Sequence, residues 1–263
     1  MKNRIAEFAE WRGVNTQEAT DIINRAAHCA EAWESRKDIY DFHKNTYYFI
    51  SALLSWETTT KYNYSDAIVA FAKTWPHYPI KTFMDHGSGI GYDAIRMIQE
   101  AGCDVYLYEL DSPHLDFAIW RLKKRNLWDK VKGVLIVTEG NPMPDYPLVD
   151  FTSSIAVIEH LEYPQRDLKH ILDRTRYVAI RVDPMVEKGN SSPTHFDTNV
   201  EFLVKLNGQD PDLLNELGIK RINSACIPIY EVTRNVPPEF RVNKFIQNGS
   251  KDSGMVEYIW SKE

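Results

Sequence analysis

The fold of this chain is decided by one short stretch, Asp85-His86-Gly87-Ser88-Gly89-Ile90-Gly91. It lies between a strand-like segment, Lys81–Asp85, and a helical pattern, Tyr92–Ala101. Glycines at three alternate positions allow a tight turn from a strand into a helix, and they let a ligand approach the main chain closely. The unpaired N–H groups at the start of the next helix favour a carboxylate or a phosphate. The stretch therefore predicts a ligand-binding turn between a strand and a helix.

Strand and helix patterns alternate through the residues that follow. Strands are predicted at 104–109, 131–137, 149–155 and 177–182, and helices at 115–126 and 163–175. This alternation is typical of βαβ units with a mainly parallel sheet. A long strand pattern, Ile219–Thr233, and a last one, Met255–Trp260, have no helical pattern between them. They predict an antiparallel hairpin at the end of the sheet.

The residues before the glycine-rich turn have a helical character. Apolar residues recur there at helical spacing and predict helices at about 16–30, 39–55 and 65–75. The segment Pro76-His77-Tyr78-Pro79 interrupts this pattern, because proline disfavours helical geometry in the residue before it. We therefore divide the chain into a helical cap, residues 1–78, and a core, residues 79–263. The cap is rich in aromatic residues, and we expect residues 56–62 to form the part of a lid nearest the ligand.

Composition narrows the class of protein. Hydrophobic residues make up 43% of the chain and charged residues 26%, as in ordinary globular proteins. The net charge of -6 argues against nucleic acid as a partner. The three cysteines are far apart and form no metal-binding or disulfide pattern. The N-terminus has no signal-like apolar run, and no segment has the roughly 18 apolar residues of a membrane span, so we expect a cytoplasmic protein.

The spacing of glycines and acids indicates which nucleotide the turn binds. A dinucleotide fingerprint requires a third glycine at the position of Tyr92, whereas this chain has it at Gly91. Asp85 precedes the first glycine, where an acid suits an ammonium group better than a pyrophosphate. About 20 residues after the turn, Glu109 ends the second strand, where an exposed acid can accept hydrogen bonds from ribose hydroxyls.

In these features the sequence resembles the class I S-adenosylmethionine-dependent methyltransferases over roughly residues 80–260. The fourth strand followed by Glu159-His160-Leu161, and the terminal hairpin, are similar to the family too. The resemblance implies a Rossmann-like three-layer α/β sandwich, with a mainly parallel seven-stranded sheet ending in an antiparallel hairpin and with the helical cap at its N-terminus. It implies S-adenosyl-L-methionine as the cofactor.

The resemblance also implies a set of cofactor-binding residues. Leu110 is expected to flank the adenine, and a polar side chain after the third strand to contact the adenine amino group. The family usually has a Gly-Asp pair there, and this chain has Thr138-Glu139-Gly140-Asn141, so either Glu139 or Asn141 serves. The full expected set is Asp85, His86, Gly87, Ser88, Gly89, Gly91, Glu109, Leu110, Glu139, Asn141 and Ile155.

Two histidines are candidates for a general base, because their ordinary pKa lies near neutrality. His195 follows the fifth strand in a loop at the ligand edge of the sheet, and His160 follows the fourth strand. Each also has a structural interpretation as a capping or loop residue, and no short-range pattern supports a metal site. We expect a small-molecule methyl acceptor. The alternatives are an NAD-dependent oxidoreductase or epimerase, and a non-catalytic nucleoside-binding protein.

Overall fold

A computed structural model describes residues 4–26, 38–45, 47, 50–51, 53–54, 61–182, 200–223, 227–233, 246–248 and 257–259 of the chain. Its helices are α1 (Arg4–Arg12), α2 (Thr16–Ala26), α4 (Ile39–Asn45), α6 (Lys61–Thr74), α7 (Tyr92–Ala101), α8 (Pro113–Lys124), α9 (Pro164–Leu172), α10 (Val200–Asn207) and α11 (Pro211–Leu217), with 3-10 helices η1 (Trp128–Lys130) and η2 (Ile158–His160). None of these helices is long and apolar enough to cross a membrane within the residues just given.

The central sheet has seven strands in the order β3-β2-β1-β4-β5-β7-β6. Its strands are β1 (Thr82–His86), β2 (Asp104–Leu110), β3 (Val131–Val137), β4 (Val149–Ile155), β5 (Thr175–Arg181), β6 (Ile219–Arg221) and β7 (Ile229–Val232). The first five are parallel, and β7 is antiparallel to both β5 and β6. The predicted mainly parallel sheet with a terminal antiparallel hairpin is therefore confirmed.

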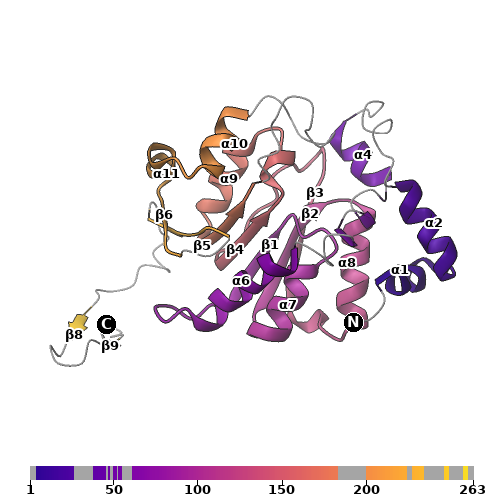
Figure 1. The fold of residues 1–263 in the computed structure, drawn as a ribbon, viewed down its shortest axis with the longest axis horizontal. Coiled ribbons are helices and arrows are strands. Elements are labelled where there is room, and N and C mark those ends of the chain that lie inside the picture. Colours follow the sequence, from indigo (N-terminus) through magenta and orange to yellow (C-terminus); the bar gives the residue numbers. More distant parts are fainter. Residues whose placement is uncertain are drawn as a thin grey trace.

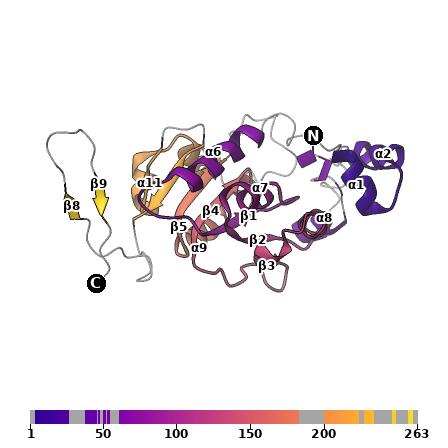
Figure 2. The same cartoon turned by 90° about the horizontal axis from the view of Figure 1, so that it is seen from below.

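The position of that hairpin in the sequence was predicted wrongly. Residues 219–233 form both of its strands, β6 and β7, and not one long strand. The final strand, β9 (Glu257–Ile259), pairs with β8 (Ile246–Asn248) in a separate two-stranded sheet, which both views show apart from the main body (Figures 1 and 2). Asn223, Ser224 and Pro228 lie between the two strands and are residues typical of a turn, and the two short strands were merged because this local signal was overlooked.

Helices cover both faces of the sheet, as a three-layer sandwich requires (Figure 1). On one face, apolar residues of α6, α7 and α8 share a core with inward-facing residues of the strands, among them Ile68, Ile95, Leu122 and Phe151. On the other face, α9, α10 and α11 pack against residues such as Met84 and Ile180. The last two of these helices lie where no element was assigned from the sequence. Helix α6 belongs to the predicted cap, yet its apolar side chains enter the main core.

Local signals begin and end several of these helices. The Ser112 side chain accepts a hydrogen bond from Leu115 N at 3.4 Å at the start of α8, with Pro113 in the first turn. Gly102, at φ 73°, ends α7 in the left-handed conformation that glycine adopts readily. These caps fix where the polypeptide leaves each helix and enters the next strand.

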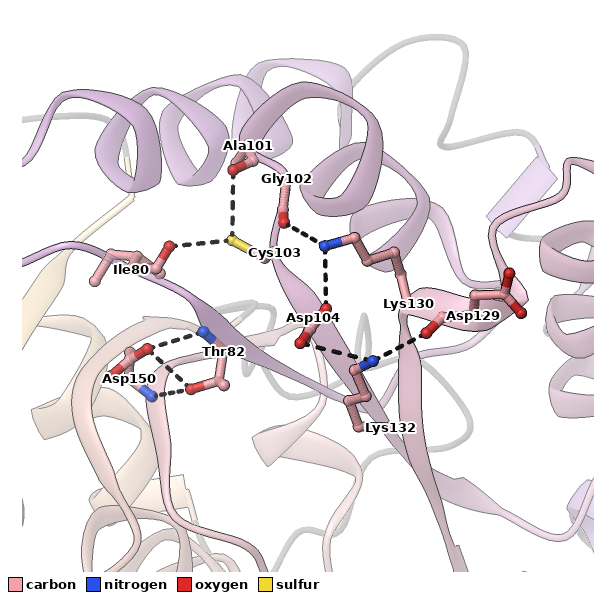
Figure 3. A network of polar contacts seen from close by, with 10 residues as sticks. All are labelled: Ile80, Thr82, Ala101, Gly102, Cys103, Asp104, Asp129, Lys130, Lys132 and Asp150. Carbon is pink, nitrogen blue, oxygen red and sulfur yellow. Dashed lines mark hydrogen bonds and ion pairs between the residues drawn. The ribbon is translucent and has the colours of Figure 1, made fainter.

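The amino-terminal edge of the sheet is closed by paired polar groups (Figure 3). The Asp150 carboxylate accepts hydrogen bonds from Thr82 N at 2.8 Å and Thr82 Oγ1 at 2.9 Å, which joins β4 to β1. Lys130 pairs with Asp104 at 3.2 Å. Burial raises the pKa of the Cys103 thiol to about 11, so this cysteine stays protonated and unreactive. Structural pairing at this edge leaves the carboxyl ends of the strands for a site.

The first helices dock on α8 beside the sheet (Figure 2). Phe8 of α1 lies edge-on to Phe117 of α8, with ring centroids 5.9 Å apart. The buried carboxylate of Glu7 pairs with Arg125 at 2.5 Å and lies 3.4 Å from Arg121. The same apolar cluster includes Ile90 of the glycine-rich turn. The N-terminal helices are thus packed directly against the predicted ligand-binding turn.

Candidate cofactor site

The glycine-rich turn connects β1 to α7 in the conformation that its glycines allow. Gly87, Gly89 and Gly91 have φ angles of 70°, 52° and 73°, a region that other residues adopt only with strain. Gly87 N and Ser88 N both donate to the Tyr108 carbonyl of β2, at 2.8 and 3.2 Å. The turn is therefore fixed between two strands at the carboxyl edge of the sheet.

Two apolar side chains cover this turn closely. A Cβ added to Gly87 would overlap the side chain of Val157, and one added to Gly89 would lie 2.5 Å from Leu53 Cδ1. Val157 follows β4, and Leu53 belongs to the N-terminal helical region. The turn thus excludes larger residues at both glycines, because of backbone conformation and because of close neighbours.

Asp85 lies beneath the turn in a buried polar environment. Its Oδ2 accepts a hydrogen bond from Ala94 N at 3.0 Å, which places a negative charge at the N-terminus of α7. Ser153 of β4 is the register partner of Asp85. The hydroxyls of Ser88 and Ser153 are buried and, among the described residues, have no hydrogen-bond partner. Buried polar atoms of this kind normally find a partner, so this part of the site is suited to a polar ligand group.

Glu109 is buried, with 8% of its surface exposed, so the prediction of an exposed strand-end acid was wrong. Its Oε2 accepts from Gly89 N at 2.7 Å and its Oε1 from Leu110 N at 2.8 Å. Nε2 of His114 lies 3.4 Å from Oε1. Burial by itself raises the pKa of Glu109, but His114 and the two N–H donors outweigh it and lower the pKa to about 2. The acid is therefore ionised and held against the glycine-rich turn.

A histidine from the N-terminal region reaches this acid through His114. His43 of α4 is buried, and its ring lies 5.6 Å from that of His114 in an edge-to-face arrangement. Burial, reinforced by the neighbouring His114 and His160 and opposed by Glu109, lowers the pKa of His43 to about 3. Lys44 of the same helix pairs with Asp111 at 3.1 Å. Helix α4 thus packs over the carboxyl end of β2.

Neither His43 nor His114 was predicted from the sequence as a site residue. His114 follows the second strand in the first turn of the next helix, a position that a parallel α/β fold brings to the ligand edge. That position was a usable signal. His43 had none, because only tertiary packing brings α4 to β2.

The other predicted residues lie around the same edge. His86 faces the opposite side of the sheet from Asp85, with Nδ1 3.0 Å from Ser154 Oγ, and burial lowers its pKa to about 4. Leu110 is half-buried and Ile155 is buried. Glu139 and Asn141 are exposed in the turn after β3, which hydrogen bonds between Thr138 and Asn141 close. His160 is half-buried in η2. His195 and residues 56–60 lie outside the described residues.

Comparison with solved structures identifies the fold. The chain aligns with an O-methyltransferase family 2 protein from Planctomyces limnophilus, solved with apigenin, at a TM-score of 0.50 and 10% identity, over 81% of this chain and 66% of that one. It aligns with phosphoethanolamine N-methyltransferase 2 of Haemonchus contortus, solved with S-adenosyl-L-methionine, at a TM-score of 0.51 and 18% identity, over 73% of this chain and 47% of that one. No protein-family model and no curated protein matches the sequence.

The chain therefore has the fold of the class I S-adenosylmethionine-dependent methyltransferases. It spans two thirds or less of the length of these two enzymes. In this chain the glycine-rich turn follows β1, the buried Glu109 lies near the end of β2, and the antiparallel strands β6 and β7 end the sheet.

Proposed function

We propose that this protein is an S-adenosylmethionine-dependent methyltransferase that acts on a small-molecule acceptor. One observation carries the proposal: three glycines in the left-handed conformation follow β1, and the amide of Gly89 donates to the buried carboxylate of Glu109. A turn and an acid joined in this way present backbone N–H donors and an ionised carboxylate, a hydrogen-bond acceptor, at one point of the sheet edge. Ligands bind at this edge in open α/β sheets.

The residues present fit the proposed cofactor. Asp85 and the hydroxyls of Ser88 and Ser153, which have no partner in the described part of the chain, form a polar niche for the aminoacyl end, where an ammonium would meet a carboxylate. Glu109 accepts hydrogen bonds from the ribose hydroxyls, and Leu110 flanks the adenine. Ile155, buried at the end of β4 on the other side of β1, gives the site an apolar wall there. Gly87 and the rest of the turn allow main-chain contact.

Glu139 and Asn141 remain the proposed contacts to the adenine amino group. Both are exposed in the turn after β3, so they have space to meet a ligand. The choice between them can be made by comparing cofactor affinity in Glu139→Ala and Asn141→Ala.

The cofactor supplies a methyl group activated by a sulfonium when it is bound. The chain itself contributes binding and orientation, because in-line transfer depends on holding the acceptor atom close to the methyl carbon. His160, half-buried beside the end of β4, and His195 are the proposed proton acceptors for a hydroxyl or amine. Apolar residues over the turn, such as Leu53 and Val157, exclude water from the reacting groups.

We further propose that residues 1–78 form a cap and that its first helices act as the lid. Leu53 lies on Gly89, and α4 lies over Glu109 through His43 and His114. A cofactor that reaches the turn has to move these side chains, so closure and binding are linked. Helix α6 contributes to the main core and anchors the cap to the sheet.

The acceptor is proposed to be small because Leu53 and α4 cover the glycine-rich turn and Glu109, and because the net charge is -6. Apigenin, with which the Planctomyces limnophilus protein was solved, is a small molecule. The cytoplasm is the proposed location, since the buried Cys103 is a free thiol.

The test is a calorimetric titration of the full chain with S-adenosylmethionine, S-adenosylhomocysteine and NAD. We expect the first two to bind with micromolar or better affinity and to raise the melting temperature, since they stabilise the native state. Binding of NAD alone would favour an oxidoreductase. Binding of S-adenosylmethionine and S-adenosylhomocysteine without methyl transfer to any acceptor of a broad panel would favour a non-catalytic nucleoside-binding protein.

A further inference from the structure

Arg181 is a charged residue at the carboxyl edge of the sheet that the proposed cofactor contacts do not use. It is the last residue of β5 and the register partner of Ile155, the last residue of β4. Ala156 N donates to the Arg181 carbonyl at 2.9 Å, which fixes the end of β4 to the end of β5. Because β4 separates β5 from β1, Arg181 lies about 10 Å across the sheet from the glycine-rich turn.

The Arg181 side chain is held by an aromatic ring. Its guanidinium carbon lies 4.5 Å from the centre of the Tyr64 ring of α6. The next residue, Ser65, is buried and donates a hydrogen bond to Asp93 of α7, which fixes this turn of α6. A guanidinium stacked on a ring uses its face and keeps its N–H edge free for an acceptor.

The charge of Arg181 is not neutralised within the described residues. No carboxylate there lies within ion-pair distance of it, whereas Arg166 at the same edge pairs with Asp167 at 2.8 Å and Lys44 with Asp111 at 3.1 Å. A planar guanidinium with a free donor edge is the side chain best matched to a carboxylate or phosphate, which it binds through two parallel hydrogen bonds.

We propose that Arg181 determines acceptor specificity by binding an anionic group, a carboxylate or a phosphate, of the methyl acceptor. The inference rests on the methyltransferase function proposed above. In that function a sulfonium cation is bound at the same edge, and Arg181, a cation that no described carboxylate compensates, opposes it from about 10 Å away. An anionic group between the two charges removes this repulsion and orients the acceptor beside the end of β4.

The experiment uses the full chain saturated with S-adenosylhomocysteine, with inorganic phosphate and acetate as separate probes in calorimetry. We expect at least one probe to bind with a dissociation constant in the millimolar range. Arg181→Gln should weaken that binding at least about tenfold, and Arg181→Lys should retain part of it, because lysine keeps the charge and loses the two-point geometry. Lys220→Gln is the control, because it removes one positive charge at an exposed position of β6. It should leave the affinity for both probes unchanged.

The two probes show whether Arg181 prefers a phosphate or a carboxylate. A labelled-methyl screen of phosphorylated, carboxylated and neutral amines and phenols then tests whether the methyl acceptor carries that group. Turnover of the anionic set, reduced in Arg181→Gln mainly through KM, supports the proposal. Equal anion binding by wild type and Arg181→Gln, no anion binding by the saturated wild type, or turnover of neutral acceptors alone would overturn it. S-adenosylhomocysteine should bind Arg181→Gln as it binds wild type. A wild type that fails to bind S-adenosylhomocysteine refutes the methyltransferase function and the role of Arg181 with it, whereas a wild type that binds S-adenosylhomocysteine but no anion refutes the role of Arg181 alone.

Discussion

The two edges of the sheet use similar residues in opposite ways. At the amino edge, Asp150 and Asp104 have short contacts with Thr82 and Lys130. At the carboxyl edge, the described residues include two buried acids around a turn of left-handed glycines, and buried serine hydroxyls without partners among those residues. Polar groups at the first edge satisfy one another. Polar groups at the carboxyl edge are held in place and can still form hydrogen bonds to a ligand. Such groups are expected at a functional site.

The largest expected difference between the edges comes from glycine. Gly87→Ala places a Cβ against Val157 at a backbone angle that alanine adopts with strain, so we expect cofactor affinity to fall roughly 100-fold. Gly102→Ala is the matched control, because Gly102 has a similar φ of 73° at the amino edge and nothing within 4 Å of the added atom. It should cost about 1 kcal/mol of unfolding free energy and leave affinity unchanged. Equal affinities in both variants would contradict the comparison.

The next effect concerns pH and helix α4. The pKa of His43 is about 3 in the docked helix and about 6.5 when exposed, so the docked state binds fewer protons. Docking is therefore complete above about pH 6.5 and weakens as pH falls toward 3. Between pH 7 and pH 5 the docking equilibrium should fall roughly 25-fold.

Hydrogen exchange of residues 38–45, corrected for intrinsic rates, measures this change. Glu109, His114 and His160 also face His43, so the variant His43→Gln isolates its share and should remove most of the pH dependence. His170→Gln, at a half-buried position near Pro144, is the control and should keep it. A pH dependence that persists in His43→Gln would assign the effect to another group.

A smaller effect is expected from Glu109. Glu109→Gln keeps the shape of the side chain and loses the charge, so cofactor affinity should fall roughly tenfold through weaker hydrogen bonds to ribose. Asp150→Asn makes the same change at the amino edge, where it should lower the melting temperature and leave affinity unchanged. Calorimetric titration and thermal unfolding of both variants give the comparison, and an unchanged affinity in folded Glu109→Gln would reassign the ribose contact.

The smallest effect is expected at the surface of the amino edge. Lys130 is half-exposed in its pair with Asp104, and such pairs contribute about 0.5 kcal/mol or less. Lys130→Gln should therefore change the melting temperature by no more than a few degrees and the cofactor affinity not at all. A large loss of affinity would show that the amino edge is coupled to the site.

Local sequence signals were sufficient for the core of the fold. The glycine-rich turn, the alternating strands and the acid at Glu109 each follow from residues close together in the chain, and the structure confirms their positions. The terminal hairpin was right in kind and wrong in place, because the turn signal of Asn223, Ser224 and Pro228 between β6 and β7 was overlooked. The burial of Glu109 was missed, since its cover comes from His114 and from the turn 20 residues earlier.

What the sequence determined by itself is the topology and the chemical type of the site, because glycine conformation, strand periodicity and an acid at a strand end are properties of short segments. Only the tertiary structure decided that His43 lies on His114, that Leu53 covers Gly89 and that Arg181 stacks on Tyr64. These pairs join residues from different elements, and the packing of α4, α6 and β5 around one sheet edge brings them together. No spacing rule within the chain encodes such contacts, since each depends on how whole helices pack against the sheet.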